Sequence, residues 1–176
     1  MTESMLPSLF DLGIEPGSFI RKLDNQNHWN AHQDEDLSRA SKLIAEKIFK
    51  EAGEKYSLWK VNTEQEFYGV VASLTANANP KDRNIDFIWV TKSELKEVDI
   101  EFDSVSEGNC LKVNDLHFDA VINQEKARQL CHNLIVKQRV AQRCKKAQTV
   151  LILQYQRDRG CKATNADLVL CDCQKP

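Results

Sequence analysis

Hydrophobic residues recur at helical spacing within residues 34–53. Leu37, Ala40, Ile44 and Ile48 fall on one face when counted at 3.6 residues per turn. Three acidic residues precede this stripe, where negative charge favours a helix start, and a glycine follows it, where a left-handed residue often ends a helix. The pattern predicts an amphipathic helix that buries one face.

Beyond residue 55 the apolar positions follow the two-residue period of strands. The clearest alternation is residues 97–103, where three apolar side chains oppose four carboxylates. Residues 66–75 carry apolar groups on both faces, which is typical of a strand in the centre of a sheet. Short connections favour antiparallel neighbours, because a parallel crossover needs a dozen or more residues. Strands are expected at residues 57–63, 66–75, 85–91, 97–103, 110–113 and 116–120.

The longest helical pattern begins at Asn123, a suitable capping residue, and continues towards Gly160. Ala127, Leu130 and Leu134 contribute to its apolar stripe. Residues 149–155 are compatible with either a continuing helix or a strand, because their β-branched side chains do not decide between the two. We prefer the continuing helix.

These elements predict an α+β fold, with a mainly antiparallel sheet of about five or six strands packed by an N-terminal helix and a long C-terminal helix. Residues 1–33 are expected to form an N-terminal arm, which either packs on its own domain or docks on a partner. Residues 34–160 are expected to form a single domain, a normal size for a chain of 176 residues. Residues 161–176 are a tail that can add a short strand.

Charge is distributed unevenly along the chain. Residues 124–162 contain ten lysines and arginines but only two carboxylates, whereas residues 1–123 contain thirteen basic and twenty-two acidic side chains. On the predicted helix Arg128, Arg139, Arg143 and Lys146 lie opposite the apolar stripe. Such a face can bind a nucleic-acid backbone or a protein. It can equally be a solvated face, or be paired with the acidic part of the chain.

The alternating acids Glu97, Asp99, Glu101 and Asp103 give a second candidate site. Neighbouring carboxylates on a strand can share a hard cation, and two lysines, Lys92 and Lys96, flank the stretch on its N-terminal side. This arrangement suggests a metal-dependent nuclease or another hydrolase. The alternative is a charged edge that prevents strands of different molecules from pairing.

The six cysteines and four histidines suggest no cofactor. The only close cysteine pair is Cys171 and Cys173, with one residue between them, whereas structural zinc sites space paired ligands by two to four residues. His117 and Asp119 share a strand face and could act as a base and its neighbour. The glycines are scattered and match no phosphate-binding loop. We therefore expect no metal and no cofactor.

No apolar run approaches the roughly twenty residues that span a bilayer, and the N-terminus lacks the pattern of a signal peptide. A cytosolic protein with reduced cysteines, not attached to a membrane, is the resulting expectation. The function that we favour from sequence is a non-catalytic binding or regulatory module, which binds a protein or a nucleic acid through Arg128, Arg139, Arg143 and Lys146. The hydrolase that uses residues 97–103 is the alternative.

Overall fold

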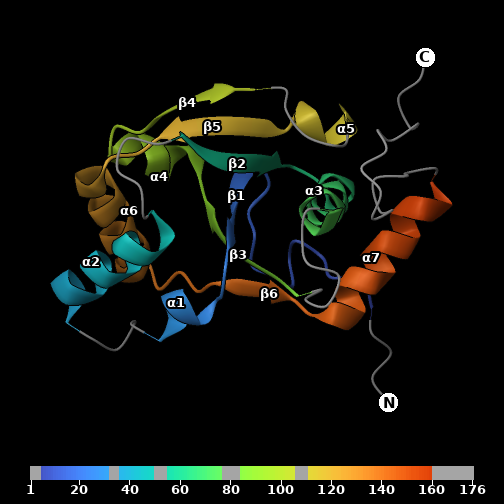
Figure 1. The fold of residues 1–176 in the computed structure, drawn as a ribbon, viewed down its shortest axis with the longest axis horizontal. Helices are drawn as coiled ribbons and strands as arrows, with labels where there is room; N and C mark the ends of the chain where they lie inside the picture. The colour runs from blue at the N-terminus through green and yellow to red at the C-terminus, as the bar shows by residue number, and fades with distance from the viewer. Residues whose placement is uncertain (1–4, 32–35, 50–54, 77–83, 106–110, 160–176) are drawn as a thin grey trace.

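The structure is a computed structural model that describes residues 5–31, 36–49, 55–76, 84–105 and 111–159. Within these residues the chain forms a six-stranded sheet in which every neighbouring pair of strands is antiparallel, in the order β4-β5-β2-β1-β3-β6 (Figure 1). The strands are β1 (Ser18–Leu23), β2 (Lys55–Val61), β3 (Ile85–Val90), β4 (Glu101–Ser104), β5 (His117–Val121) and β6 (Gln142–Cys144). The predicted α+β fold is confirmed.

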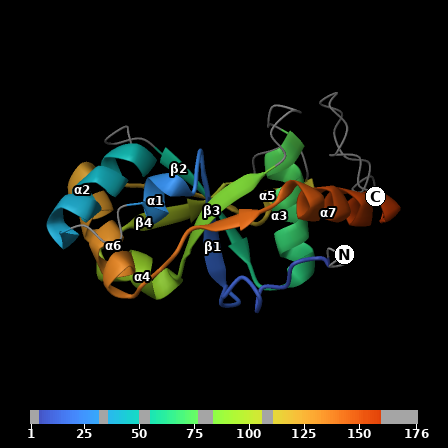
Figure 2. The ribbon, with the colours of Figure 1, turned by 90° about the horizontal axis from the view of Figure 1, so that it is seen from below.

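Helices cover both faces of this sheet. The described helices are α1 (Asn27–Asn30), α2 (Leu37–Ile48), α3 (Glu64–Ala76), α4 (Lys92–Glu97), α5 (Leu111–Asn114), α6 (Gln124–Val136) and α7 (Lys146–Asp158). One layer contains α2 and α6, which pack against each other, and the layer across the sheet contains α3 and α7 (Figures 1 and 2). None of the helices among the described residues is both long enough and apolar enough to cross a membrane.

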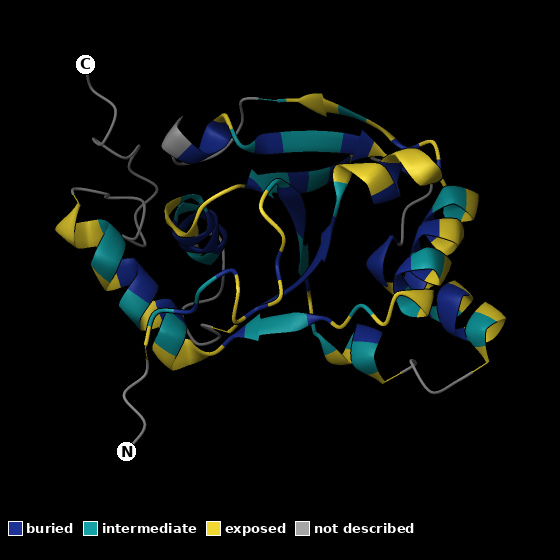
Figure 3. Ribbon diagram, turned by 180° about the vertical axis from the view of Figure 1, so that it is seen from behind, coloured by how far each residue is buried: buried dark blue, intermediate teal, exposed yellow. Residues whose placement is uncertain are grey.

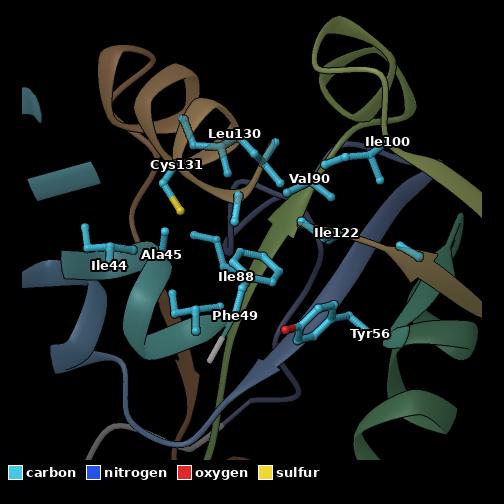
Figure 4. Packing of buried hydrophobic residues seen from close by; sticks show 14 of the residues in the cluster. Ile44, Ala45, Phe49, Tyr56, Ile88, Val90, Ile100, Ile122, Leu130 and Cys131 are labelled. Carbon is cyan, nitrogen blue, oxygen red and sulfur yellow. The ribbon is translucent and has the colours of Figure 1, made fainter. Parts of the chain in front are cut away.

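Each helical layer encloses its own hydrophobic core. On one side Ile44 of α2 and Leu130 of α6 meet Ile88 of the central strand β3 (Figure 4). On the other side Phe67 of α3 and Ile152 of α7 meet Phe87. Because side chains alternate between the two faces, every residue of β3 is buried, as the dark blue of Figure 3 shows along this strand.

The N-terminal region takes part in the sheet. Residues 1–33 were expected to form an arm, but Ser18–Leu23 is strand β1, which lies between β2 and β3. Preceding residues Leu9, Leu12 and Ile14 are buried in the core that α3 and α7 cover. Helix α2 confirms the predicted amphipathic helix, with Asp36 accepting a hydrogen bond from the Arg39 N–H at its start.

The predicted strand at residues 66–75 is wrong, because these residues belong to helix α3. Phe67, Val70, Val71 and Leu74 are all buried and lie at helical spacing. Tyr68 and Ala72 are buried as well, so the helix is apolar on more than one face and the two periods are hard to distinguish. A start signal was present, since the Glu66 N–H donates to the Thr63 hydroxyl.

The predicted strands at 97–103 and 110–113 also need correction. Residues 92–97 form helix α4, in which Thr91 and Glu94 make a reciprocal capping box, and β4 begins only at residue 101. Asp99 adopts a left-handed conformation with φ of 54° in the turn between them. Residues 111–114 form helix α5, and residues 106–110 lie outside the described part of the chain.

The single helix predicted for residues 123–160 is interrupted. Helix α6 ends at Val136, residues 142–144 form the edge strand β6, and helix α7 starts at Lys146. The end of α6 is a Schellman turn, in which the Gln138 N–H donates to the Ile135 carbonyl and the Arg139 N–H to the Leu134 carbonyl. Gln138 has φ of 56° without being glycine, so the usual sequence signal for this turn is absent. The predicted tail at 161–176 lies outside the described residues.

Candidate functional site

The four basic residues predicted to share one helix face lie on separate elements. Arg128 is on α6, Arg139 is in the loop between α6 and β6, Arg143 is on β6, and Lys146 is the first residue of α7. Because the helix is interrupted, these side chains do not form one continuous surface. Each contact has to be considered separately.

Arg143 forms a two-pronged ion pair with the buried Asp86 of β3. Its Nε donates to Oδ1 at 2.6 Å and its Nη2 donates to Oδ2 at 2.8 Å, while the side chain of Asp86 is 6% exposed. The backbone N–H of Gln26 also donates to Asp86 Oδ2, at 2.9 Å. This arrangement fixes strand β6 and the start of α1 to the central sheet.

Arg139 forms a second internal ion pair, with Glu94 of α4. Its Nη2 donates to Glu94 Oε1 at 2.7 Å, and the exposed fractions of the two side chains are 12% and 4%. The guanidinium stacks on the ring of Trp89 with 3.2 Å between the guanidinium carbon and the ring centre. Burial alone would raise the pKa of Glu94, but the Thr91 backbone hydrogen bond and the charge of Arg139 outweigh it, so this pKa lies below its ordinary value.

The other two predicted residues are at the surface. Arg128 lies 3.7 Å from Glu46 of α2, and about half of each of these side chains is exposed. Lys146 is exposed, and its backbone N–H donates to the side-chain oxygen of Asn84 at 2.9 Å. The structure therefore separates the predicted face into two arginines that are paired internally and two exposed residues on different helices.

The predicted acidic site is divided by a turn. Glu97 ends α4, Asp99 lies in the turn, and only Glu101 and Asp103 lie on β4. In the described residues no group of three or more histidine, cysteine, aspartate or glutamate side chains is arranged to hold a metal ion. Asp103 instead lies directly opposite Asp119 of β5, and a pair of like charges at this position weakens strand pairing.

His117 and Asp119 are brought together as the sequence suggested. The distance from His117 Nε2 to Asp119 Oδ1 is 3.7 Å, and His117 Nδ1 lies 2.9 Å from the carbonyl oxygen of Val105. His117 is buried, and its ring lies against the ring of Trp59. Both ring nitrogens thus face protein groups, which is the environment of a structural histidine.

The two described cysteines are buried free thiols. Cys131 lies in the core between α2 and α6, and Cys144 lies in the core that α3 and α7 cover. Burial raises the pKa of both thiols, that of Cys144 to about 12. They behave as small hydrophobic side chains. Cys110, Cys161, Cys171 and Cys173 lie outside the described residues.

An open hollow lies beside the stacked pair of Trp89 and Arg139. We call it the Trp89 hollow; it is formed by three segments that are far apart in the sequence. It is lined by Leu12, Gly13, Glu15, Trp89, Lys137, Gln138, Arg139, Val140 and Gln142. Of these residues, the sequence analysis had selected only Arg139. No periodic pattern connects the segments, so no local signal in the sequence could have identified the hollow.

Comparisons of the chain with protein-family models, with curated proteins and with solved structures find no match.

Proposed function

We propose that this protein is a non-catalytic binding module that docks an apolar side chain of another protein in the Trp89 hollow. The observation that carries the proposal is the exposure of the apolar side chain of Val140 in the lining, together with two exposed apolar side chains that are close to lining residues in the sequence. Phe10 is 90% exposed, Val136 is 60% exposed and Val140 is 43% exposed. Val140 lines the hollow, and the other two lie within two residues of lining positions.

The lining supports a protein partner. Exposed apolar groups beside a hollow favour burial against another apolar surface. Arg139 holds Trp89 in place by stacking and is itself held by Glu94, so this part of the site is ordered before a partner arrives. Prior ordering reduces the entropy lost on binding.

The charges around the hollow favour a protein over a nucleic acid. Arg139 is paired with Glu94, and Lys137 lies 3.4 Å from Glu94 and 3.2 Å from Glu97. Glu15 adds a further negative charge to the lining. The positive charge of the loop is therefore largely balanced by carboxylates of the same molecule, whereas binding to a phosphate backbone depends on cations that neutralise the phosphates.

The test is affinity capture from a lysate of the source cells, with the wild-type protein and three aspartate variants. Phe10→Asp and Val140→Asp place a charge beside the hollow. Val121→Asp is the matched control, because Val121 is 49% exposed but lies on β5. We expect a partner that binds the wild type and Val121→Asp, and that is lost from Phe10→Asp and Val140→Asp, with the affinity then measured on purified components.

Two outcomes would contradict the proposal. One is a set of captured proteins that does not differ between Val140→Asp and Val121→Asp. The other is tight binding of RNA or DNA that weakens steeply with salt and is retained by both variants, because this would assign binding to exposed cations and not to the hollow.

A further inference from the structure

The two edges of the sheet differ in what covers them. β6 forms one edge, and α1 lies against the residue that leads into it, because the Asn30 side chain donates to the Ala141 carbonyl at 3.4 Å and accepts from the Ala141 N–H at 3.0 Å. β4 forms the other edge, and no helix or strand of the described residues lies beyond it (Figures 1 and 3). Three of the four residues of β4 are exposed. The edge at β4 is therefore the open one.

The register of β4 shows which of its backbone groups face outward. Val105 follows the strand opposite His117, and its N–H donates to the His117 carbonyl at 3.0 Å. Hydrogen-bonded and non-hydrogen-bonded pairs alternate in an antiparallel ladder, so Asp103 also bonds to β5, whereas the N–H and C=O of Phe102 and Ser104 point away from it. Such outward groups are the template on which an extended segment adds as a further strand.

The side chains of β4 divide between the two faces of the sheet. Phe102 packs against Phe19 and Phe118, with ring centres 5.1 and 6.0 Å away, on the face that α2 and α6 cover. Glu101 and Asp103 point to the other face, two residues apart. An open hollow lies along this segment and is lined by Lys96, Asp99, Ile100, Glu101, Phe102 and Asp103. It shares no residue with the Trp89 hollow.

Glu101 and Asp103 are the charges that an added strand meets directly, because they lie on β4 itself, whereas Lys96 and Asp99 precede it. None of the ion pairs among the described residues includes Glu101 or Asp103. On their face of the sheet, Lys55 of β2 is in line with Glu101 but lies two strand spacings away, roughly 10 Å. The edge strand therefore presents two carboxylates without a cation beside them.

These carboxylates distinguish between possible occupants of the edge. A second copy that paired its own β4 here would bring its acids next to Glu101 and Asp103, and like charges on neighbouring strands oppose pairing. Asp103 already faces Asp119 of β5. A strand with lysine or arginine at alternate positions instead places a cation beside each carboxylate, and its intervening residue then lies on the face of Phe102.

We propose that the open edge of β4 binds an extended basic segment of a partner protein, which adds to the sheet as a further strand. The outward backbone groups of Phe102 and Ser104 hold the segment by hydrogen bonds. Cationic side chains opposite Glu101 and Asp103 select it, and an apolar side chain between the two cations packs beside Phe102.

Binding of synthetic peptides tests this proposal. The probe is a fluorescent peptide of about eight residues, a normal strand length, in which lysine and valine alternate. In the control peptide glutamate replaces every lysine. Fluorescence anisotropy at low ionic strength gives the affinities, because salt screens exposed charges. Hydrogen exchange of the isotope-labelled protein, followed by NMR, reports on the amides of Phe102 and Ser104.

Three variants separate the backbone contribution from the charges. Ser104→Pro removes an outward N–H and keeps the hydrogen bonds to β5, since proline is tolerated where the N–H of an edge strand faces solvent. Asp103→Lys reverses a charge at the edge, and Asp11→Lys reverses an exposed carboxylate elsewhere as the matched control. Asp103→Lys tests the site even if Ser104→Pro does not fold.

We expect the lysine peptide to bind the wild type and Asp11→Lys with a Kd of about 1 mM or below, and about tenfold or more tightly than the glutamate peptide. Asp103→Lys should lose this preference, and Ser104→Pro should bind about tenfold more weakly. In the wild type the bound peptide should slow hydrogen exchange at Phe102 and Ser104.

The proposal is overturned if the two peptides bind the wild type equally, or if neither binds below about 10 mM. It is also overturned if Asp103→Lys keeps the preference of Asp11→Lys, if folded Ser104→Pro binds as tightly as the wild type, or if saturation leaves the exchange at Phe102 and Ser104 unchanged. Exchange at these amides that slows with protein concentration alone would overturn it too, because a second copy would then occupy the edge.

Discussion

At the β3–β6 side of the sheet, Asp86 forms an ion pair with Arg143 and Glu94 forms one with Arg139. At the end of β1, in contrast, no carboxylate of the described residues lies within ion-pair distance of Arg21. The three guanidinium groups have similar surroundings otherwise, since all are partly removed from water and two stack on aromatic rings. The difference shows that arginines of low exposure are held in two ways here. Arg139 and Arg143 connect elements of the fold through buried carboxylates, whereas Arg21 contacts the Ser57 carbonyl and the ring of Tyr56.

The largest predicted effect is on the Asp86–Arg143 pair. Asp86→Ala removes two hydrogen bonds from the guanidinium and the acceptor of the Gln26 N–H. We expect the free energy of unfolding, measured by urea denaturation, to fall by about 3 kcal/mol. A double-mutant cycle with Arg143→Ala should show coupling of about 1 kcal/mol or more between the two positions.

Asp11→Ala is the control for that experiment, because Asp11 is an exposed carboxylate outside both pairs. It should change the stability by no more than about 0.5 kcal/mol. If Asp86→Ala costs as little as Asp11→Ala, the β3–β6 ion pair does not stabilise the fold, and the contrast with Arg21 disappears.

A pH effect comes next, because the pKa of Glu94 lies below its ordinary value in the folded protein. A carboxyl group of this kind stabilises the fold above its unfolded pKa of about 4.3, and that contribution is lost as the pH falls through the folded pKa. Glu94→Gln keeps a capping side chain but removes the charge, so we expect it to be about 2 kcal/mol less stable at pH 7.

The decisive measurement is the slope of unfolding free energy between pH 7 and pH 3. The wild type should lose stability faster than Glu94→Gln on acidification, and the two curves should converge at low pH. Parallel curves would mean that Glu94 does not ionise differently in the folded and unfolded states.

A smaller effect of opposite sign is expected at the unpaired arginine. Arg21→Met ends the desolvation of a guanidinium that has no carboxylate within ion-pair distance among the described residues, and it replaces the stem with an apolar chain, so we expect a gain of about 1 kcal/mol in unfolding free energy. Arg143→Met should lose about 2 kcal/mol because it leaves Asp86 buried without its cation. Urea denaturation of both variants gives the comparison directly, and a similar loss in both would show that Arg21 is as structural as Arg143.

The sequence predicted the class of fold and several boundaries well. The helix cap at Asn123, the strand before Thr91 and the amphipathic helix expected within residues 34–53 are all found, the last as α2 (Leu37–Ile48), because each rests on a local signal. The strand prediction at 66–75 failed because helix α3 is buried on more than one face, although Thr63 gave a capping signal at its start. The strand prediction at 97–103 began too early because Thr91 caps helix α4, which continues to Glu97. Local chemistry therefore decides helix starts even when the apolar period is ambiguous.

The candidate sites could not be predicted in the same way. Arg139 and Arg143 looked like part of one exposed face, because their partners Glu94 and Asp86 are more than forty residues away in the sequence. The interruption of the helix between them depends on Gln138, which takes a left-handed conformation normally marked by glycine. The break is formed by the backbone hydrogen bonds of the Schellman turn, and the ion pairs of Arg139 and Arg143 follow it.

The smallest predicted change in stability concerns Gln138, at the break between α6 and β6. Gln138→Gly removes the steric cost of a left-handed residue directly before Arg139, partly offset by the greater freedom of the unfolded chain, so we expect a gain of about 0.5 kcal/mol in unfolding free energy. Gln129→Gly is the matched control, because Gln129 is exposed in the middle of α6, and it should cost about 1 kcal/mol. The change of unfolding free energy with pH that we assign to Glu94 should be the same in Gln138→Gly. The turn that places Arg139 beside Glu94 needs a left-handed residue at position 138, and glycine adopts that conformation freely. A loss of that slope would mean that the Gln138 side chain, and not the turn, positions Arg139.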